Sequence, residues 1–341
     1  MVDEDGETIT MDGPNKRMKV DDHDTTLVSY ADLSMGVRTS SLSNPTLQLT
    51  GHSGSVYALE YNPSGSALVS ASFDKSLLLW GHSDYENYNI LEGHKNAVLD
   101  CHWMDEETVV SASADKTVQL WDALTGQRLR KWQGHDAIVN CCAGLSPQLV
   151  ASAGDDGSCR VWDRRQKSPV SQLPSDFPVL AVTGTEENQL LFAAGIDSKI
   201  TAWDLKMNKK VYAMTGHTDT VTCLALHPEK THLLSNSMDS TLKMWDIQPF
   251  AQGSKRQIKE FVGHKHNAER GLLKCSWSPD GKMVTAGSAD KMVHVWDEFS
   301  TQELYLLPGH KGCVNTVVFH PTENVIASGA SDKHIFVGEL S

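Results

Sequence analysis

The stretch Gly93–Asp122, GHKNAVLDCHWMDEETVVSASADKTVQLWD, decides the fold of this chain. It opens with Gly-His, closes with Trp-Asp, and holds apolar runs broken by a tight Ala-Asp-Lys turn. Related stretches occur seven times, at intervals of about 41 residues. A repeat of this length indicates one supersecondary unit whose copies pack against each other, rather than two ordinary domains.

Three residue types mark the repeats: a histidine after a glycine, a closing tryptophan, and an aspartate six residues before that tryptophan. The histidines are His52, His94, His135, His217, His264 and His310. The tryptophans are Trp80, Trp121, Trp162, Trp203, Trp245 and Trp296, and the aspartates are Asp74, Asp115, Asp156, Asp197, Asp239 and Asp290. The seventh repeat keeps Asp332 but has Gly338 in place of the tryptophan.

Each repeat predicts three β-strands, because short apolar or alternating segments are separated by turn residues. In the first repeat these segments are VYALEYNP, ALVSASFD and SLLLW. The stretch that leads to the next Gly-His predicts a fourth strand. TLQLT, at 46–50, is such a fourth strand with no repeat before it, and the chain ends after the third strand of the seventh repeat.

This pattern resembles the WD40 β-propeller family over roughly residues 45–341. The resemblance implies an all-β, seven-bladed propeller in which the N-terminal strand completes the last blade, so that no sheet edge stays open. Residues 1–44 are polar and have few aromatic or branched apolar side chains, which predicts a disordered acidic tail. Within the tail, Lys16, Arg17 and Lys19 fit a nuclear import signal, or else are ordinary solvated charges.

The composition limits the kinds of partner. A formal net charge of -13 disfavours non-specific binding of nucleic acid, although it does not exclude a local basic patch. The seven cysteines lie mostly in apolar runs and include no CxxC pair, which favours free thiols in a reducing compartment over disulfides or a structural zinc site. Without an apolar leader or an 18-residue apolar run, we expect a soluble protein that is not secreted.

The repeated histidines, aspartates and serines could suggest catalysis, but the family resemblance implies a structural role. In WD40 blades the histidine, the turn aspartate, a hydroxyl of the second strand and the indole N–H form one hydrogen-bonded chain. In the second repeat these would be His94, Asp115, Trp121 and either Ser111 or Ser113. We expect the same chain at His52, Asp74, Trp80, His135, Asp156, Trp162, His217, Asp239, Trp245, His264, Asp290 and Trp296.

Motifs of catalysis and cofactor binding are missing from the sequence. It has no phosphate-binding loop, no HExxH and no GxSxG, and a catalytic triad would be single rather than repeated. His264 and His266 could share one face of a strand as metal ligands, but no further Cys or His lies at metal-ligand spacing. We therefore expect no enzyme activity, no cofactor and no metal.

The segment Trp162-Asp163-Arg164-Arg165 fits W-D-x-R, which docks some WD40 proteins onto the adaptor of cullin-RING ubiquitin ligases. The alternative function is therefore that of a ligase substrate receptor, with Arg165 as the docking residue. Arg165 is otherwise a solvated arginine, since basic residues are common after Trp-Asp. A signalling propeller of the G-protein β type would need an N-terminal heptad helix, which residues 1–44 do not show.

The repeats also depart from their common pattern. The fourth repeat has SDFPVLAV (175–182) in place of Gly-His, so we expect its polar network to be incomplete, and the sixth carries the insertion KHNAERGLLKCSW (265–277). These departures, with SFDKSLLLW, LLSNSMDSTLKMWDIQPFA and ASDKHIFVGEL, resemble the WD40 proteins of the spliceosomal U5 small nuclear ribonucleoprotein. That resemblance implies a nuclear, non-catalytic scaffold subunit that acts in pre-mRNA splicing. Its partners would be the large central scaffold protein and other spliceosomal proteins; contact with RNA would be secondary, and no membrane or small-molecule substrate would be involved.

WD40 geometry implies which residues line the narrow top face of the ring. One set follows the first-strand valine: Tyr57, Leu99, Asn140, Leu180, Thr222, Leu273 and Asn315. The other precedes the turn aspartate: Phe73, Ala114, Asp155, Ile196, Met238, Ala289 and Ser331. We predict a protein-binding surface formed by Tyr57, Phe73, Leu99, Asn140, Leu180, Ile196, Met238 and Leu273, unless the leucines and Ile196 pack between blades.

Overall fold

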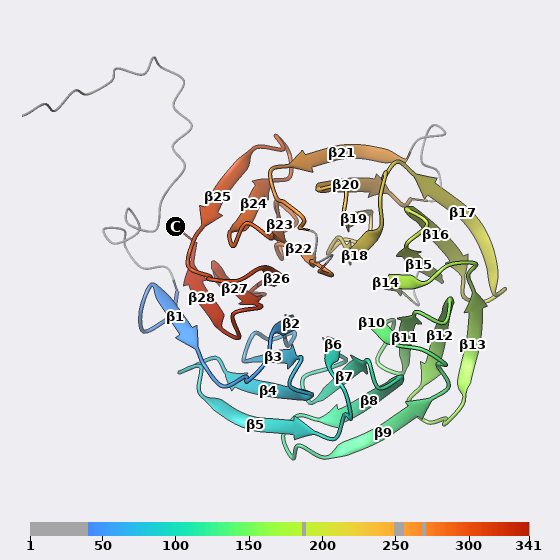
Figure 1. The fold of residues 1–341 in the computed structure, drawn as a ribbon, viewed down its shortest axis with the longest axis horizontal. Helices are drawn as coiled ribbons and strands as arrows, with labels where there is room; N and C mark the ends of the chain where they lie inside the picture. The colour runs from blue at the N-terminus through green and yellow to red at the C-terminus, as the bar shows by residue number, and fades with distance from the viewer. Residues whose placement is uncertain (1–39, 186–188, 249–255, 268–270, 341) are drawn as a thin grey trace, which may run out of the picture.

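The computed structural model describes residues 40–185, 189–248, 256–267 and 271–340. The candidate import signal at Lys16, Arg17 and Lys19 lies outside these residues. Every regular element within them is a β-strand, and the strands form seven four-stranded antiparallel sheets arranged as blades around a central axis (Figure 1). The predicted all-β, seven-bladed propeller is confirmed. The described ranges contain no helix long and apolar enough to cross a membrane.

Each of blades 1 to 6 consists of four strands in sequence order from the axis outward. Blade 1 contains β2 (Val56–Tyr61), β3 (Ala67–Ser72), β4 (Ser76–Gly81) and β5 (Asn87–Glu92). Blade 2 contains β6 (Val98–Trp103), β7 (Thr108–Ser113), β8 (Thr117–Asp122) and β9 (Arg128–Gln133). Blade 3 contains β10 (Val139–Gly144), β11 (Leu149–Gly154), β12 (Ser158–Asp163) and β13 (Pro169–Pro174). Blade 4 contains β14 (Val179–Thr185), β15 (Leu190–Gly195), β16 (Lys199–Asp204) and β17 (Lys209–Thr215). Blade 5 contains β18 (Val221–Leu226), β19 (His232–Ser237), β20 (Thr241–Asp246) and β21 (Gln257–Val262). Blade 6 contains β22 (Cys275–Trp277), β23 (Met283–Gly287), β24 (Val293–Asp297) and β25 (Glu303–Leu307).

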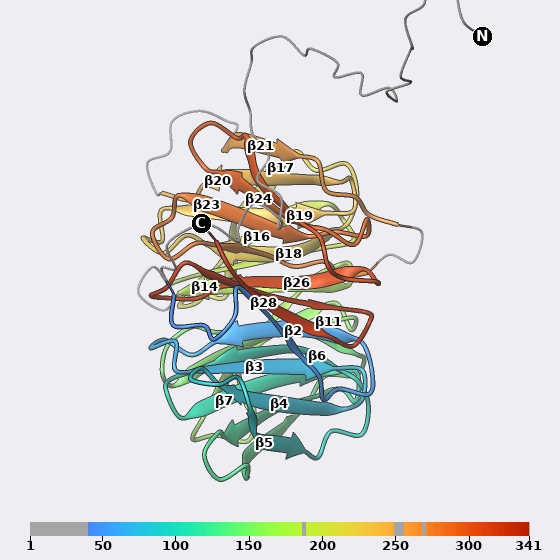
Figure 2. The same cartoon turned by 90° about the vertical axis from the view of Figure 1, so that its left-hand side faces the viewer.

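Blade 7 contains both ends of the described chain. Its inner strands are β26 (Val314–Phe319), β27 (Val325–Ala330) and β28 (Ile335–Glu339), and its outer strand is β1 (Thr46–Leu49). β1 pairs antiparallel with β28, from Thr46 opposite Gly338 to Leu49 opposite Ile335. β26 and β2 lie side by side where the first and last blades meet (Figure 2). The N-terminal strand therefore closes the ring, as the sequence predicts.

The hydrophobic core lies between the blades. One cluster joins Leu77, Leu79 and Leu91 of blade 1 to the inner strands and Trp121 of blade 2, and similar clusters fill the other spaces between blades. Each blade therefore buries one face against the next, which is why a single repeat is not stable alone and a closed ring is.

The propeller begins earlier than the predicted boundary at residue 45. Leu42 is buried in the cluster between blades 7 and 1, the Ser41 hydroxyl donates to Glu323 at 3.0 Å, and the Ser40 N–H donates to Glu339 at 3.0 Å. Residues 40–44 belong to the ring because Leu42 finds apolar partners there. Their polar composition had placed them with the tail.

Candidate interaction face of the propeller

The start of the first strand and the turn between the second and third strands lie at the same end of each blade. In blade 1, Val56 of β2 pairs with Ser72 of β3, so the Gly-His segment lies beside the Asp74 turn. The same register occurs in blades 2, 3, 5 and 7. We call this end of the ring the top face.

A hydrogen-bonded chain joins these two segments to the tryptophan. In blade 2, His94 Nδ1 lies 2.9 Å from Asp115 Oδ2 and His94 Nε2 lies 2.8 Å from Ser111 Oγ, which accepts the Trp121 indole N–H at 2.8 Å. Burial alone would raise the pKa of Asp115, but the hydrogen bonds from His94 and Thr117 lower it overall. The carboxylate therefore stays ionised and fixes the histidine.

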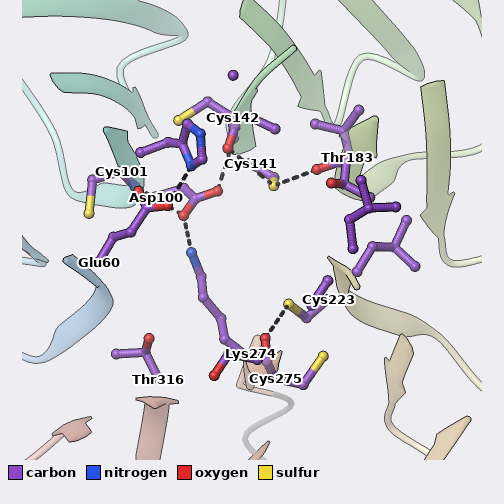
Figure 3. Close-up of a pocket in the computed structure, with 18 of the residues that line it drawn as sticks. Glu60, Asp100, Cys101, Cys141, Cys142, Thr183, Cys223, Lys274, Cys275 and Thr316 are labelled. Carbon is purple, nitrogen blue, oxygen red and sulfur yellow. Dashed lines mark hydrogen bonds and ion pairs between the residues drawn. The ribbon is translucent and has the colours of Figure 1, made fainter. Parts of the chain in front are cut away.

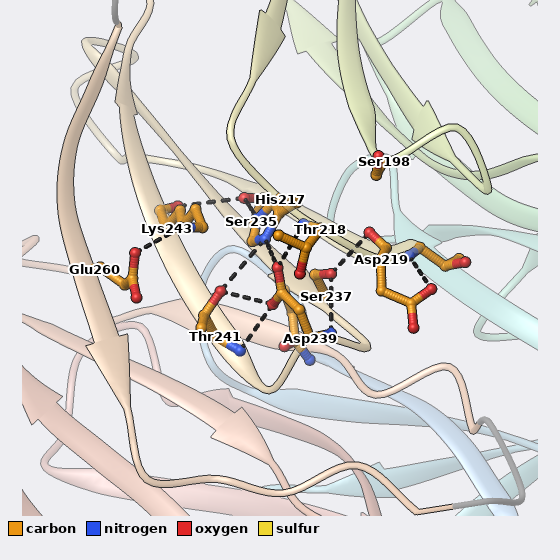
Figure 4. Close-up of polar contacts among 12 residues, drawn as sticks. Ser198, His217, Thr218, Asp219, Ser235, Ser237, Asp239, Thr241, Lys243 and Glu260 are labelled. Carbon is orange, nitrogen blue, oxygen red and sulfur yellow. Dashed lines mark hydrogen bonds and ion pairs between the residues drawn. The ribbon is translucent and has the colours of Figure 1, made fainter.

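Blades 1, 3 and 5 have the same chain through Ser70, Ser152 and Ser235. Figure 4 shows His217, Ser235 and Asp239 of the blade 5 chain. The preceding glycine is required by close packing, because a Cβ at Gly134 would lie 3.0 Å from the Trp162 ring. In blade 7, His310 binds Asp332 and Ser328, and the Phe336 ring packs edge-on against the histidine where a tryptophan is missing. The predicted His, Asp and Trp residues of blades 1, 2, 3 and 5 are joined in this way, and in blade 2 the linking hydroxyl is that of Ser111 rather than Ser113.

Blade 6 does not form the expected chain, which corrects the roles given to His264, Asp290 and Trp296. His264 Nε2 lies 2.9 Å from Asn236 Oδ1 of blade 5, while the Asp290 carboxylate lies 3.1 Å from His294 Nε2. The Trp296 indole donates to the Val262 carbonyl and stacks on His294. His264 still lies beside the Trp296 ring, with ring centroids 5.8 Å apart, but Ala286 stands where the other blades have the serine that joins histidine to tryptophan. His264 therefore binds Asn236, and His294 binds Asp290.

Burial lowers the pKa of His264 to about 3 and that of His266 to about 4. His264 Nδ1 and His266 Nε2 are buried without a hydrogen-bond partner. Across the described residues, no group of three His, Cys, Asp or Glu side chains is placed to hold a metal ion. Two neutral imidazoles are therefore packed together here.

Blade 4 lacks the histidine, and its Asp197 carboxylate accepts a hydrogen bond from the Lys199 backbone N–H of its own turn. The Ser175–Pro178 segment instead binds the neighbouring turns: the Ser175 N–H donates to Gly157 in blade 3, and the Pro178 carbonyl accepts from Ile196. Phe177 therefore lies between the turns of blades 3 and 4.

The predicted docking residues differ in their exposure. Phe73 and Ile196 are exposed, and Tyr57, Leu99 and Met238 are half-buried. Asn140, Leu180 and Leu273 are buried, so they cannot form a docking surface in this conformation. Asn140 donates to Asp155 and to the Val179 carbonyl, which turns its side chain into the joint between blades 3 and 4.

Three exposed apolar side chains at the top end of blades 3 and 4, those of Ile138, Phe177 and Ile196, define what we call the apolar sector. They are 37%, 51% and 51% exposed, values that leave much apolar area for a partner to cover. Asp136, Asp155, Asp176 and Asp219, in the top-face segments of blades 3 to 5, are also exposed. Ile138 and Phe177 were not predicted, because they are absent from the two positions that the family geometry emphasises.

The central channel is a cavity of about 470 Å³ lined by inner strands (Figure 3). Asp100 of blade 2 and Lys274 of blade 6 form an ion pair across it, and Asp100 also accepts the Cys142 N–H at 2.9 Å. Burial alone would lower the pKa of Lys274, but the Asp100 carboxylate raises it overall, so the lysine stays charged. The pair was not predicted, because its members are 174 residues apart.

Five cysteines line this channel: Cys101, Cys141, Cys142, Cys223 and Cys275. All seven cysteines are free thiols, and burial raises the pKa of Cys101, Cys141 and Cys142. Protonated thiols are poor nucleophiles. On the outer part of blade 3, the exposed guanidinium of Arg165 is held by Asp163, at 2.7 Å and 3.0 Å, within its own turn.

Comparison with known proteins identifies the class. The model of the WD domain, G-beta repeat, matches residues 43–81, 85–122, 126–163, 208–246, 255–297 and 301–337. The unmatched interval contains most of blade 4, the blade without Gly-His. The chain belongs to the WD40 repeat family.

Within that family, the chain is similar to proteins named for one particle. It is 47% identical to the U5 small nuclear ribonucleoprotein 40 kDa protein of Mus musculus, over 89% of this chain and 86% of that protein. The protein of the same name from Dictyostelium discoideum is 39% identical, over 96% and 94% of the two chains. Pre-mRNA-splicing factor cwf17 of Schizosaccharomyces pombe is 38% identical, over 96% and 95%.

Proposed function

We propose that this chain is a non-catalytic scaffold subunit of the U5 small nuclear ribonucleoprotein and acts in pre-mRNA splicing in the nucleus. The observation that carries the proposal is the 47% identity over 89% of the chain to a protein named for that particle. The relative named as a splicing factor supports the same assignment. The partners proposed are the large central scaffold protein and other proteins of the particle.

The apolar sector supports docking of a protein. Burying a large apolar side chain contributes about 1.5–3 kcal/mol, so Ile138, Phe177 and Ile196 together offer enough free energy to anchor a partner. Because the ring is closed and its blades pack tightly, the surface is formed before binding and loses little conformational entropy.

The contacts of the His–Asp–Ser groups support a non-catalytic role. In blade 2, Ser111 is fully buried, and its oxygen already binds His94 and Trp121. A nucleophile needs an open approach for its substrate, which such a hydroxyl lacks. The same arrangement in four blades fits a structural function better than a reaction centre.

Purification from nuclei tests the proposal. The chain, carrying an affinity tag, should co-purify with U5 RNA and with the large central scaffold protein, identified by RNA sequencing and mass spectrometry. Recovery of a stable nuclear complex without that RNA would contradict it.

A further inference from the structure

Six lysines form a second surface on the top face, which we call the lysine arc: Lys75, Lys95, Lys265, Lys291, Lys311 and Lys333. They occupy two equivalent positions, directly after the Gly-His histidine or directly after the turn aspartate. The lysines belong to blades 6, 7, 1 and 2, which are consecutive around the closed ring. All six are exposed, on a chain whose net charge is -13.

The six side chains have no ion-pair partner among the described residues, unlike Lys243, Lys259 and Lys274. The turn aspartates below them bind histidines and backbone N–H groups, and Asp74, for example, accepts from His52 and from the Ser53 N–H. Six lysines face solvent against four such aspartates and the exposed Glu92 beside Ser76, so the surface keeps an excess of positive charge. Lys116, the next lysine round the ring, donates to the Asp136 carbonyl and marks the border with the acidic blades.

Exposed aromatic surface lies within the arc. The Phe73 ring is 58% exposed beside Lys75 and packs edge-on against Tyr57, with ring centroids 6.4 Å apart. The Phe73 N–H donates to the Ser55 carbonyl, and the Ser55 hydroxyl contacts the Ser331 carbonyl in the blade 7 turn that carries Lys333. The aromatic pair therefore lies between two lysines of neighbouring blades.

We propose that the lysine arc binds the phosphate backbone of single-stranded RNA, with one base stacked on Phe73. A run of positive charge together with an exposed ring is the arrangement that such strands require. An acidic protein segment is the other polyanion to consider, but the exposed Phe73 ring among the lysines favours a nucleic acid, because a base can stack on the ring and a carboxylate side chain cannot. Among the described residues of the arc, Phe73 is the exposed aromatic side chain, and Val262, three residues before Lys265, is also exposed.

The choice of RNA rather than DNA as the ligand rests on the proposed function. The inference that the arc binds a single-stranded nucleic acid rests only on its lysines and on Phe73. Binding by the purified chain can therefore be tested without any spliceosomal partner, and its failure would leave the protein-docking proposal intact. The reverse also holds, because loss of the nuclear complex would not change the affinity of the arc for an oligonucleotide.

The chain itself provides substitutions that its fold accepts. Lys75, Lys291 and Lys333 have φ values of 76°, 74° and 74°, and Ser240 has the equivalent position in blade 5 with φ of 61°. Ser53 has the position after the histidine in blade 1. A variant with all six lysines replaced by serine should therefore fold, and unchanged thermal unfolding would verify this. The matched control replaces six exposed lysines outside the arc by serine, namely Lys167, Lys199, Lys206, Lys209, Lys210 and Lys282.

The probe is a fluorescent 12-nucleotide oligouridine, followed by anisotropy with the purified full chain. Single strands release about 0.7 cation per phosphate contacted. Six contacts therefore predict that the logarithm of the binding constant falls against the logarithm of the salt concentration with a slope of about -4. The serine variant should bind at least about 30-fold more weakly at 0.1 M salt and lose most of that slope, while the control variant should bind like the wild type. Equal binding by wild type and serine variant would overturn the proposal. Displacement of the RNA by an equimolar 12-residue polyglutamate would also overturn it, because the arc would then be a site for an acidic protein segment.

Discussion

The two parts of the top face share one architecture but have different side chains at equivalent positions. One part is formed by blades 3 to 5, and the other by blades 6, 7, 1 and 2. The residue after the histidine is Asp136 in blade 3 but Lys95 in blade 2. The residue after the turn aspartate is Gly157 or Ser240 in blades 3 and 5, but Lys75 in blade 1. The hydrogen-bonded anchors hold the fold, so the residues next to them are free to differ. This difference separates an apolar, acidic sector from a basic arc on one face.

Breaking the Asp100–Lys274 ion pair in the central channel should have the largest effect, because it destabilises the ring that carries both surfaces. Lys274→Met leaves Asp100 buried without its cation, which should lower the free energy of unfolding by about 3–5 kcal/mol. Urea unfolding measures this change. The double variant Lys274→Met/Asp100→Leu has no unpaired buried charge, so its free energy of unfolding should return close to that of the wild type. If Lys274→Met alone is as stable as the wild type, the ion pair does not stabilise the ring.

Removing the apolar sector should affect protein docking alone. Ile138→Ala/Phe177→Ala/Ile196→Ala places alanine where other blades already have Ala97, Ala137 and Ala114. The loss of anchors should weaken capture of the central scaffold protein by about 2–4 kcal/mol, or roughly 30- to 1000-fold. Quantitative pull-down measures this, with oligouridine affinity as the internal control. Weakened RNA binding in this variant would mean that the two surfaces are not separate.

Removing the ring of Phe73 should affect RNA binding alone. Phe73→Ala corresponds to the native Ala114 and Ala289 of blades 2 and 6. Loss of base stacking should weaken oligouridine binding by about 1–3 kcal/mol and leave the salt slope unchanged, because no phosphate contact is lost. The same affinity in anisotropy would exclude stacking on this ring.

The histidines of blade 6 should make stability depend on pH. The pKa of His264 is about 3 in the folded protein and near 6.5 when unfolded, so the unfolded chain binds the proton more readily. Stability is therefore complete above pH 6.5 and falls as the pH is lowered toward 3, by about 1–2 kcal/mol between pH 7 and pH 5. Thermal unfolding of His264→Gln should show a smaller fall over this range. An equal fall would assign the dependence to other groups.

The sequence predicts the fold well, because Trp-Asp, Gly-His and the turn aspartate repeat at fixed spacing. It fails where a local change alters three-dimensional partners. Blade 6 has Ala286 in place of the linking serine, and its Asp290 binds His294 instead of His264. The joint between blades 3 and 4 buries Asn140 and Leu180. The Asp100–Lys274 pair connects distant blades, so no local pattern indicates it. Exposure of Phe177 follows from its place between two turns, which only the packed ring determines.

Ultraviolet crosslinking in nuclei, followed by purification of the tagged chain, tests most directly whether RNA and protein use different parts of the top face. Mass spectrometry of the crosslinked peptides should find nucleotides on the turns of blades 1 and 7, including the peptide with Phe73 and Lys75, and none on Phe177 or Ile196. Nucleotides crosslinked to the apolar sector, with none on the arc, would contradict the separation of the two surfaces.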